Sequence, residues 1–255
     1  MSADFAGRVV LVTGGARGLG RGIAQAYADA GAQVVVCGRT APEQSDLDFV
    51  GCDVRDAAAV QEMVTRVVGR LGRLDVVVNN AGGSPPAPAA TMSPRFAERI
   101  VALNLLAPFY LGQAANAVMQ EQPDGGVILN IGSVAAIRPA PGTAAYNAAK
   151  AGLVVLTRSL ALEWAPKVRV NIITPGLVRT QTAAQTYGED TTSVAATIPM
   201  GRLAEPSDIA AACLMLSRPD AGYITGADLF VDGGGEFPAF YAAHADLTFG
   251  GVLDA

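Results

Sequence analysis

Residues 8–20 read R-V-V-L-V-T-G-G-A-R-G-L-G, an apolar run followed at once by a glycine-rich turn. The run does not alternate apolar with polar residues, which is typical of a strand buried on both faces of a parallel sheet. A helical pattern follows over about 21–30 and ends before Gly31. A glycine turn between a buried strand and a helix lets backbone N–H groups approach a phosphate. This unit predicts nucleotide binding; the alternative is a turn with a structural role alone.

The rest of the chain alternates short β-rich runs with longer helical patterns, which predicts a parallel sheet covered by helices on both faces. We expect further strands over 33–37, 48–51, 74–78, 127–131, 168–173 and 228–231, and helices over 56–71, 94–120, 144–164 and from Pro206 onward. No repeat, linker or change of composition divides the chain. The prediction is one α/β domain over 1–255, a doubly wound Rossmann-type fold with a mostly parallel seven-stranded sheet and a C-terminal extension over about 236–255.

Composition argues against several functional classes. The net charge is -5 and no run of Lys or Arg occurs, which argues against nucleic acid or an anionic membrane as a partner. Cys37, Cys52 and Cys213 show no C-x-x-C spacing and fit a reducing compartment, and the single histidine, His244, argues against a metal site. No leader pattern and no uninterrupted apolar stretch of about 20 residues occurs. We expect a cytoplasmic protein.

Four further motifs fall at the ends of predicted elements. The sequence N-N-A-G occupies 79–82, Ser133 follows the fifth strand, Tyr146 and Lys150 form Y-x-x-x-K, and P-G at 175–176 follows the sixth strand. Residues four apart share a helix face, so Tyr146 and Lys150 point into one site. An ammonium nearby would lower the pKa of the Tyr146 phenol from its usual value of about 10 toward the range of a general acid/base. The Ser133 hydroxyl would hold a substrate oxygen on which negative charge develops.

In this order and spacing, T-G-x-x-x-G-x-G at 13–20 and the four motifs resemble the short-chain dehydrogenase/reductase family over residues 8–234. The resemblance implies an oxidoreductase that moves a hydride between a nicotinamide cofactor and a carbonyl or secondary alcohol. It implies that Lys150 also binds the nicotinamide ribose and that Asn104 supports a water-linked proton relay. Taken alone, Asn104 would be a polar residue satisfied inside a helix packing face. The expected catalytic set is Asn104, Ser133, Tyr146 and Lys150.

The residue that ends the second strand indicates which cofactor binds. An acidic residue there bonds the ribose 2′-hydroxyl of NAD, whereas a nearby Arg accommodates the 2′-phosphate of NADP. Here Gly38 is followed by Arg39, and Arg17 lies in the glycine turn, so NADP(H) is favoured. NAD(H) use is the alternative, in which Arg39 is solvated or is repositioned by the short connection over 40–48. The expected cofactor contacts are Gly14, Arg17, Gly18, Leu19, Arg39, Asp53, Val54, Asn80, Ala81, Gly82, Tyr146, Lys150, Pro175, Gly176, Val178 and Thr180.

The expected pocket walls are residues 83–90, 134–142, a lid over 181–200 and the tail after Gly235. The first two are mostly apolar with Arg138 as the main charge, which favours an apolar ketone or 3-oxoacyl compound as the small-molecule substrate. Reductases of the family that act on acyl carrier proteins often have basic residues before the fifth strand and before the sixth. Here those two regions contain only Lys167, which argues against an acyl carrier protein as a partner.

The resemblance also implies a homotetramer or homodimer built on the two long helices and the final strand. The alternative function is a catalytically silent nucleotide sensor or scaffold on the same fold. Such proteins usually lose a member of the Ser–Tyr–Lys set, and none is lost here.

Overall fold

The computed structural model describes residues 4–43, 46–181, 187–188 and 190–238. In this part of the chain, one sheet has the strand order β3-β2-β1-β4-β5-β6-β7, and every neighbouring pair is parallel. The doubly wound fold is therefore confirmed. The strands are β1 (Val9–Thr13), β2 (Gln33–Gly38), β3 (Asp48–Gly51), β4 (Val76–Asn79), β5 (Gly126–Ile131), β6 (Val168–Pro175) and β7 (Asp228–Val231).

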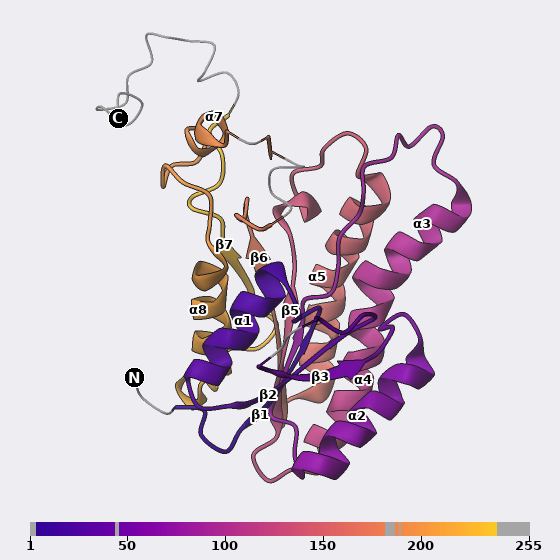
Figure 1. Ribbon diagram of the computed structural model, residues 1–255, viewed down its shortest axis with the longest axis vertical. Coiled ribbons are helices and arrows are strands. Elements are labelled where there is room, and N and C mark those ends of the chain that lie inside the picture. The colour runs from indigo at the N-terminus through magenta and orange to yellow at the C-terminus, as the bar shows by residue number, and fades with distance from the viewer. Residues whose placement is uncertain (1–3, 44–45, 182–186, 189, 239–255) are drawn as a thin grey trace.

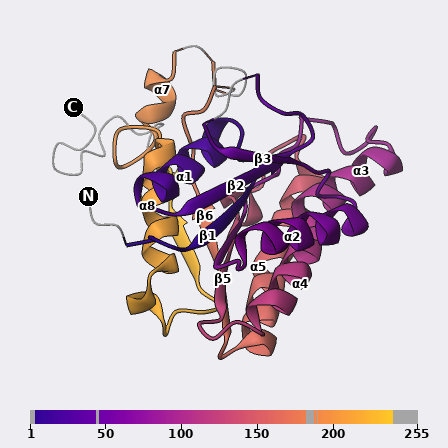
Figure 2. The same ribbon diagram turned by 60° about the horizontal axis from the view of Figure 1, so that its bottom comes forward.

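Helices cover both faces of the sheet (Figures 1 and 2). The helices α1 (Gly18–Asp29) and α8 (Pro206–Ser217) pack together on one face. The other face is covered by α2 (Ala57–Leu71), α4 (Ala107–Met119) and α5 (Ala144–Trp164). Each layer has its own apolar core, because the strands are apolar on both sides. The shorter elements are α3 (Pro94–Val101), η1 (Ala102–Leu106), η2 (Val134–Ala136), α7 (Thr192–Ala195) and η3 (Pro219–Ala221).

The helix ends follow local chemistry. The Asp56 side chain accepts hydrogen bonds from the N–H groups of Ala58 and Ala59 and begins α2, which ends at Gly72 in the left-handed conformation. Glu205 and Asp208 form a capping box that begins α8. These predicted ends are confirmed, and α5 has the predicted bounds.

Two helices differ from the prediction. Helix α1 begins at Gly18, not near residue 21, because the last turn of the glycine motif already has helical geometry. The helix predicted over 94–120 is continuous but contains a π-helical segment, η1, which joins α3 to α4. A π segment inside an α-helix is frequently found at a functional site.

The strand order reverses between β1 and β4, and a ligand crevice is expected at such a point in a doubly wound sheet. The two strand ends are joined there through Thr13. Its hydroxyl oxygen accepts hydrogen bonds from the backbone N–H groups of Asn80 at 3.0 Å and Ala81 at 2.9 Å. The Asn80 amide donates in turn to the Thr13 carbonyl at 2.9 Å. The glycine turn and the N-N-A-G segment therefore form one edge of the crevice.

The run Pro94–Met119 is long and apolar enough to cross a membrane by length and composition, as core helices of globular domains also are. Here it packs against α2 and α5. Among the described residues, no group of three or more His, Cys, Asp or Glu side chains could hold a metal ion. The three cysteines are free and buried.

Candidate active site

Ser133, Tyr146 and Lys150 lie at the carboxyl edge of the sheet. Ser133 is the N-cap of η2, immediately beyond β5, and its Oγ accepts a 3.2 Å hydrogen bond from the Ala135 N–H. Tyr146 and Lys150 lie one turn apart near the start of α5. The Ser133 hydroxyl also makes a hydrogen bond with the Tyr146 phenol. The structure brings the three residues together, as the motif spacing predicts.

Lys150 is buried, with 4% of its surface exposed. Its Nζ donates a 2.7 Å hydrogen bond to the carbonyl oxygen of Ile131, the last residue of β5. Burial lowers the pKa of Lys150 to about 8, because removing an ammonium from water disfavours its charged form. Lys150 is therefore a buried hydrogen-bond donor that is held in a fixed position at the inner end of the site.

The pKa of Tyr146 departs from expectation. Burial raises it, and the hydrogen bond with Ser133 offsets that rise in part. The predicted lowering by Lys150 was wrong for this geometry. The Lys150 Nζ is 5.8 Å from the Tyr146 ring centroid and is directed at the Ile131 carbonyl, so desolvation of the phenol outweighs attraction by the ammonium.

Asn104 lies within η1 and is fully buried. Its Oδ1 accepts a hydrogen bond from the Gly83 N–H at 2.9 Å, and its Nδ2 donates to the carbonyls of Gly83 at 3.0 Å and Ile100 at 2.9 Å. A Cβ atom on Gly82 would lie 2.8 Å from Asn104 Oδ1 and 3.5 Å from Lys150 Nζ. Asn104 therefore holds the N-N-A-G backbone against the floor of the site.

A buried chain of polar side chains lies beneath the site and was missed by the sequence analysis. Asn79 donates to Asn130 Oδ1 at 2.9 Å, and Asn130 donates to Thr157 Oγ1 at 2.8 Å. Asn79 and Asn130 are opposite each other on β4 and β5, and Thr157 lies two turns beyond Lys150 on α5. The sequence did contain a signal for this chain, namely polar residues in strands that are otherwise apolar. The chain ties β4 and β5 to α5, which carries Tyr146 and Lys150.

The glycine turn has the geometry of a phosphate cradle. A Cβ on Gly20 would lie 2.4 Å from both Asn80 Nδ2 and the Gly14 carbonyl oxygen, so only glycine lets α1 begin this close to the turn. Gly18 has φ +53 and open space around it apart from Thr180, 4.0 Å from an added Cβ. Among the described residues, no side chain caps the first turn of α1. Open backbone N–H groups at a helix start fit a pyrophosphate.

Arg17 and Arg39 are exposed, and no hydrogen bond or ion pair joins either guanidinium to another described residue, although the charge of Arg39 contributes to the lowered pKa of Asp53. Gly38 ends β2 and places no carboxylate beside them. Asp53 is already engaged: its carboxylate accepts hydrogen bonds from Arg55 Nε at 2.9 Å and Nη2 at 2.5 Å, and this pairing lowers the pKa of Asp53. Two unpaired guanidinium groups beside a phosphate cradle fit a cofactor with an additional phosphate.

The remaining predicted contacts flank this crevice. Pro175 ends β6, Gly176 packs against the Asp232 backbone, and Val178 forms a β-bridge with Ala204. The Val54 side chain is buried and Leu19 packs on the α1 face of the sheet. These residues support the shape of the crevice, and their contact with a cofactor stays a prediction.

The loop after β4, the loop before α5 and the segment beyond β7 are bonded to one another. The Ala87 N–H donates to the Gly142 carbonyl at 2.9 Å and joins the loop after β4 to the loop before α5. Arg138 makes ion pairs with Asp232, at 3.3 Å, and with Glu236. Its charge is therefore not free, contrary to the expectation that it dominates the pocket wall. The predicted lid lies partly outside the described residues, as does the tail over 239–255.

Tyr187, in the described part of the lid, was also missed. Its pKa is raised by burial and by electrostatic interaction with Tyr146, which places the two phenols near each other. An isolated aromatic residue in a polar segment gave no usable signal in the sequence. Tyr187 thus adds an aromatic side chain near the Tyr146 phenol.

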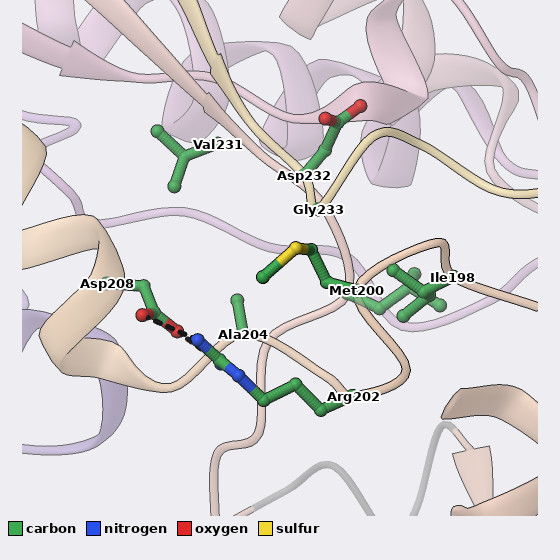
Figure 3. Close-up of a pocket in the computed structure, with 9 residues that line it drawn as sticks. Ile198, Met200, Arg202, Ala204, Asp208, Val231, Asp232 and Gly233 are labelled. Atoms are coloured by element: carbon green, nitrogen blue, oxygen red, sulfur yellow. Dashed lines mark hydrogen bonds and ion pairs between the residues drawn. The ribbon is translucent and has the colours of Figure 1, made fainter. Parts of the chain in front are cut away.

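A cavity of about 170 Å³ lies between the segment Ile198–Ala204, the start of α8 and the end of β7 (Figure 3). Arg202 pairs with Asp208 across its edge at 2.6 Å. Ser133, Tyr146 and Lys150 do not line it. Asp232 and Gly233 line it from the segment beyond β7.

Comparison with known proteins identifies the family. The sequence profile described as enoyl-(acyl carrier protein) reductase matches residues 14–236. D-threitol dehydrogenase of Mycolicibacterium smegmatis is 38% identical over 92% of this chain and 96% of its own. 3α-Hydroxysteroid dehydrogenase of Mediterraneibacter gnavus is 38% identical over 89% of this chain and 96% of its own. The structure of ligand-free aldohexose dehydrogenase from Thermoplasma acidophilum superposes with a TM-score of 0.87 at 30% identity, covering 97% of this chain and 99% of that one.

A parallel sheet with a phosphate cradle and a Ser–Tyr–Lys cluster defines a nicotinamide-dependent oxidoreductase fold. The chain belongs to the short-chain dehydrogenase/reductase family. It is an NAD(P)-dependent enzyme that acts on alcohol or carbonyl groups.

Proposed function

We propose that this enzyme transfers a hydride between NADP(H) and a carbonyl or secondary alcohol, and that the substrate is an apolar ketone or a 3-oxoacyl compound. The observation that carries the proposal is the hydrogen bond between the Ser133 hydroxyl and the Tyr146 phenol above the buried Lys150. This intact cluster favours catalysis over a silent nucleotide sensor. The relatives named above act on polyols, steroids and sugars, which all contain secondary alcohols or the corresponding carbonyls.

The chain's own residues would divide the proton chemistry. The Ser133 hydroxyl donates a hydrogen bond to the substrate oxygen and stabilises the negative charge that develops on it. The Tyr146 hydroxyl gives its proton to that oxygen in reduction and takes it back in oxidation. The Lys150 ammonium, held by the Ile131 carbonyl, lies one helical turn from Tyr146 and supplies a fixed hydrogen-bond donor in the same site. Asn104 keeps the Gly82–Gly83 backbone in place beside Lys150.

The cofactor would lie along the carboxyl edge of the sheet from the glycine turn to Tyr146. Its pyrophosphate fits the open N–H groups at Gly18, and its 2′-phosphate fits Arg17 and Arg39. When bound, the nicotinamide supplies or accepts the hydride. Lys150 would hold the nicotinamide ribose hydroxyls.

Two separate exposed apolar faces support a homotetramer. Val155 and Leu162 are 61% and 84% exposed and lie seven residues apart on one face of α5. Met215, Tyr223, Ile224 and Phe230 are exposed around the end of α8 and the edge strand β7. Exposed apolar patches of this kind mark protein interfaces. We further propose that the enzyme is cytoplasmic.

The direct test is a panel of ketones and secondary alcohols incubated with each of the two cofactors, followed through the absorbance of the reduced nicotinamide. We expect reduction of neutral ketones with NADPH. Tight binding of NADPH without turnover of any compound in the panel would contradict the proposal and favour the nucleotide sensor.

A further inference from the structure

The segment Asp232–Phe237, beyond β7, lies over the turn that Ser133 begins. Arg138 is the connecting residue: its backbone N–H donates to the Val134 carbonyl within that turn, and its guanidinium pairs with Asp232 and Glu236. The segment is also bonded on its other side. The Phe237 N–H donates to the Thr197 carbonyl at 2.8 Å, and the Met200 N–H donates to Gly233 at 3.2 Å. It therefore forms a wall between the Ser133 turn and the described part of the lid.

In this segment and the loops next to it, the described acidic side chains outnumber the basic ones. The loops 83–90 and 134–142, the described residues of 187–200 and the segment 232–238 contain one basic side chain, Arg138, and three carboxylates, from Asp190, Asp232 and Glu236. The next cations outward are already paired, Arg179 with Glu205 and Arg202 with Asp208. Apart from the buried Lys150 ammonium, these segments therefore carry more carboxylates than cations.

The opposite end of the crevice offers exposed cations, although the Asp53 carboxylate also interacts with the charge of Arg39. Arg17 and Arg39 are exposed there without ion-pair partners among the described residues. A polyanionic cofactor would be attracted to that end, whereas a substrate approaching Ser133 would meet the carboxylates that Arg138 holds beside the turn. Because Asp232 and Glu236 side chains are only 17% and 27% exposed, water screens their field less than it does at an open surface.

We propose that Glu236 and Asp232 determine substrate charge: the enzyme accepts uncharged ketones and alcohols and discriminates against those that carry a carboxylate near the reacting carbon. This inference rests on the proposed function and narrows its substrate class. Arg138 is a positioning residue in this scheme, since it fastens the two carboxylates beside the turn and neutralises one of them.

The test uses pairs of ketones that share a carbon skeleton and differ only in a methyl ester against the free carboxylate, assayed with saturating NADPH. We expect wild-type kcat/KM to favour the ester. Glu236→Gln keeps an oxygen that accepts a hydrogen bond from Arg138 but removes the charge, and Asp232→Asn does the same for the other carboxylate. Each should raise the acid-to-ester ratio of kcat/KM about fivefold. The wild-type discrimination should also weaken as salt is added.

Asp124→Asn is the matched control, because it removes one carboxylate that pairs with Arg73 at the amino end of β5. Its acid-to-ester ratio should equal that of the wild type. A wild type that prefers the acid, or an unchanged ratio in both Glu236→Gln and Asp232→Asn, overturns the inference and leaves the proposed function standing. Bound NADPH with no turnover of esters or acids overturns the proposed function and this inference with it.

Discussion

The Nζ of Lys150 donates a 2.7 Å hydrogen bond to the carbonyl oxygen of Ile131, so helix α5 is joined to the end of β5 by a buried ammonium. One turn earlier on the same helix, Tyr146 bonds to Ser133, two residues beyond Ile131. The lysine thus fixes the distance between the helix and the strand end that together hold the reacting groups.

The buried Lys150 should make stability depend on pH in a defined window. Its pKa is lowered from 10.5 to about 8 on folding, so between these values the unfolded chain binds more protons and stability rises with pH. Lys150→Met lacks this contribution. The free energy of unfolding of Lys150→Met relative to wild type should therefore fall by about 2 kcal/mol between pH 7 and pH 9.5. Urea unfolding at the two pH values measures it, and a constant difference would show that the ammonium is well solvated.

Tyr146→Phe should lower turnover at least about a hundredfold, because the substrate oxygen loses its proton donor. The affinity for NADPH should change little, since the ring and its packing remain. Tyr223→Phe removes a hydroxyl from a fully exposed ring and serves as the control. Steady-state kinetics and cofactor titrations of both variants give the answer, and substantial turnover by Tyr146→Phe would reject the assignment.

NADPH should bind at least about tenfold more tightly than NADH at low ionic strength, because Arg17 and Arg39 can form charge-assisted hydrogen bonds with the 2′-phosphate. Arg39→Ala should reduce that preference, and Gly38→Asp should reverse it by placing a carboxylate where the phosphate would lie. Paired titrations by calorimetry measure the effect. Arg66→Ala, which removes an exposed guanidinium from α2, should leave the ratio unchanged. Equal affinities in the wild type would mean that Arg39 does not reach the cofactor.

Leu162→Glu should reduce the particle mass from a tetramer to a dimer, because it places a charge on the exposed apolar face of α5. Light scattering at micromolar concentration measures the mass, and circular dichroism checks that the variant is folded. Gln61→Glu, on the exposed side of α2, is the matched charge control and should remain tetrameric. A monomeric wild type would refute the proposed assembly.

The fold could be predicted because its signals are local. Continuous apolar runs indicated the strands, and Asp56, Gly72 and Glu205 marked helix ends within a residue. Ser133, Tyr146 and Lys150 were found because the family's motifs fix their spacing along the chain. The sequence showed Tyr146 and Lys150 as neighbours on a helix, but it did not show that Lys150 is bound to Ile131, and the predicted pKa change of Tyr146 was therefore wrong.

Other features of the site depend on contacts between distant segments. The partners Arg138 and Glu236 are separated by almost a hundred residues, and Asn130 reaches Thr157 across the interface between β5 and α5. The sequence gives no signal for such pairs, because their partners are far apart along the chain. Each residue alone resembles an ordinary surface charge or an ordinary polar residue in a strand. The π-helical segment around Asn104 could not be predicted from the sequence either, because its apolar residues continue the pattern of the flanking helices.

The buried polar chain Asn79–Asn130–Thr157 also has an evolutionary consequence. It supports the reacting groups from below through secondary-structure elements, whereas the surrounding loops contact one another from above through bonds such as Ala87 to Gly142. Mutations that reshape the loops away from Gly83, which Asn104 binds, therefore leave this buried polar chain in place. New substrate preferences can arise in the loops of this scaffold while the reaction centre is inherited unchanged.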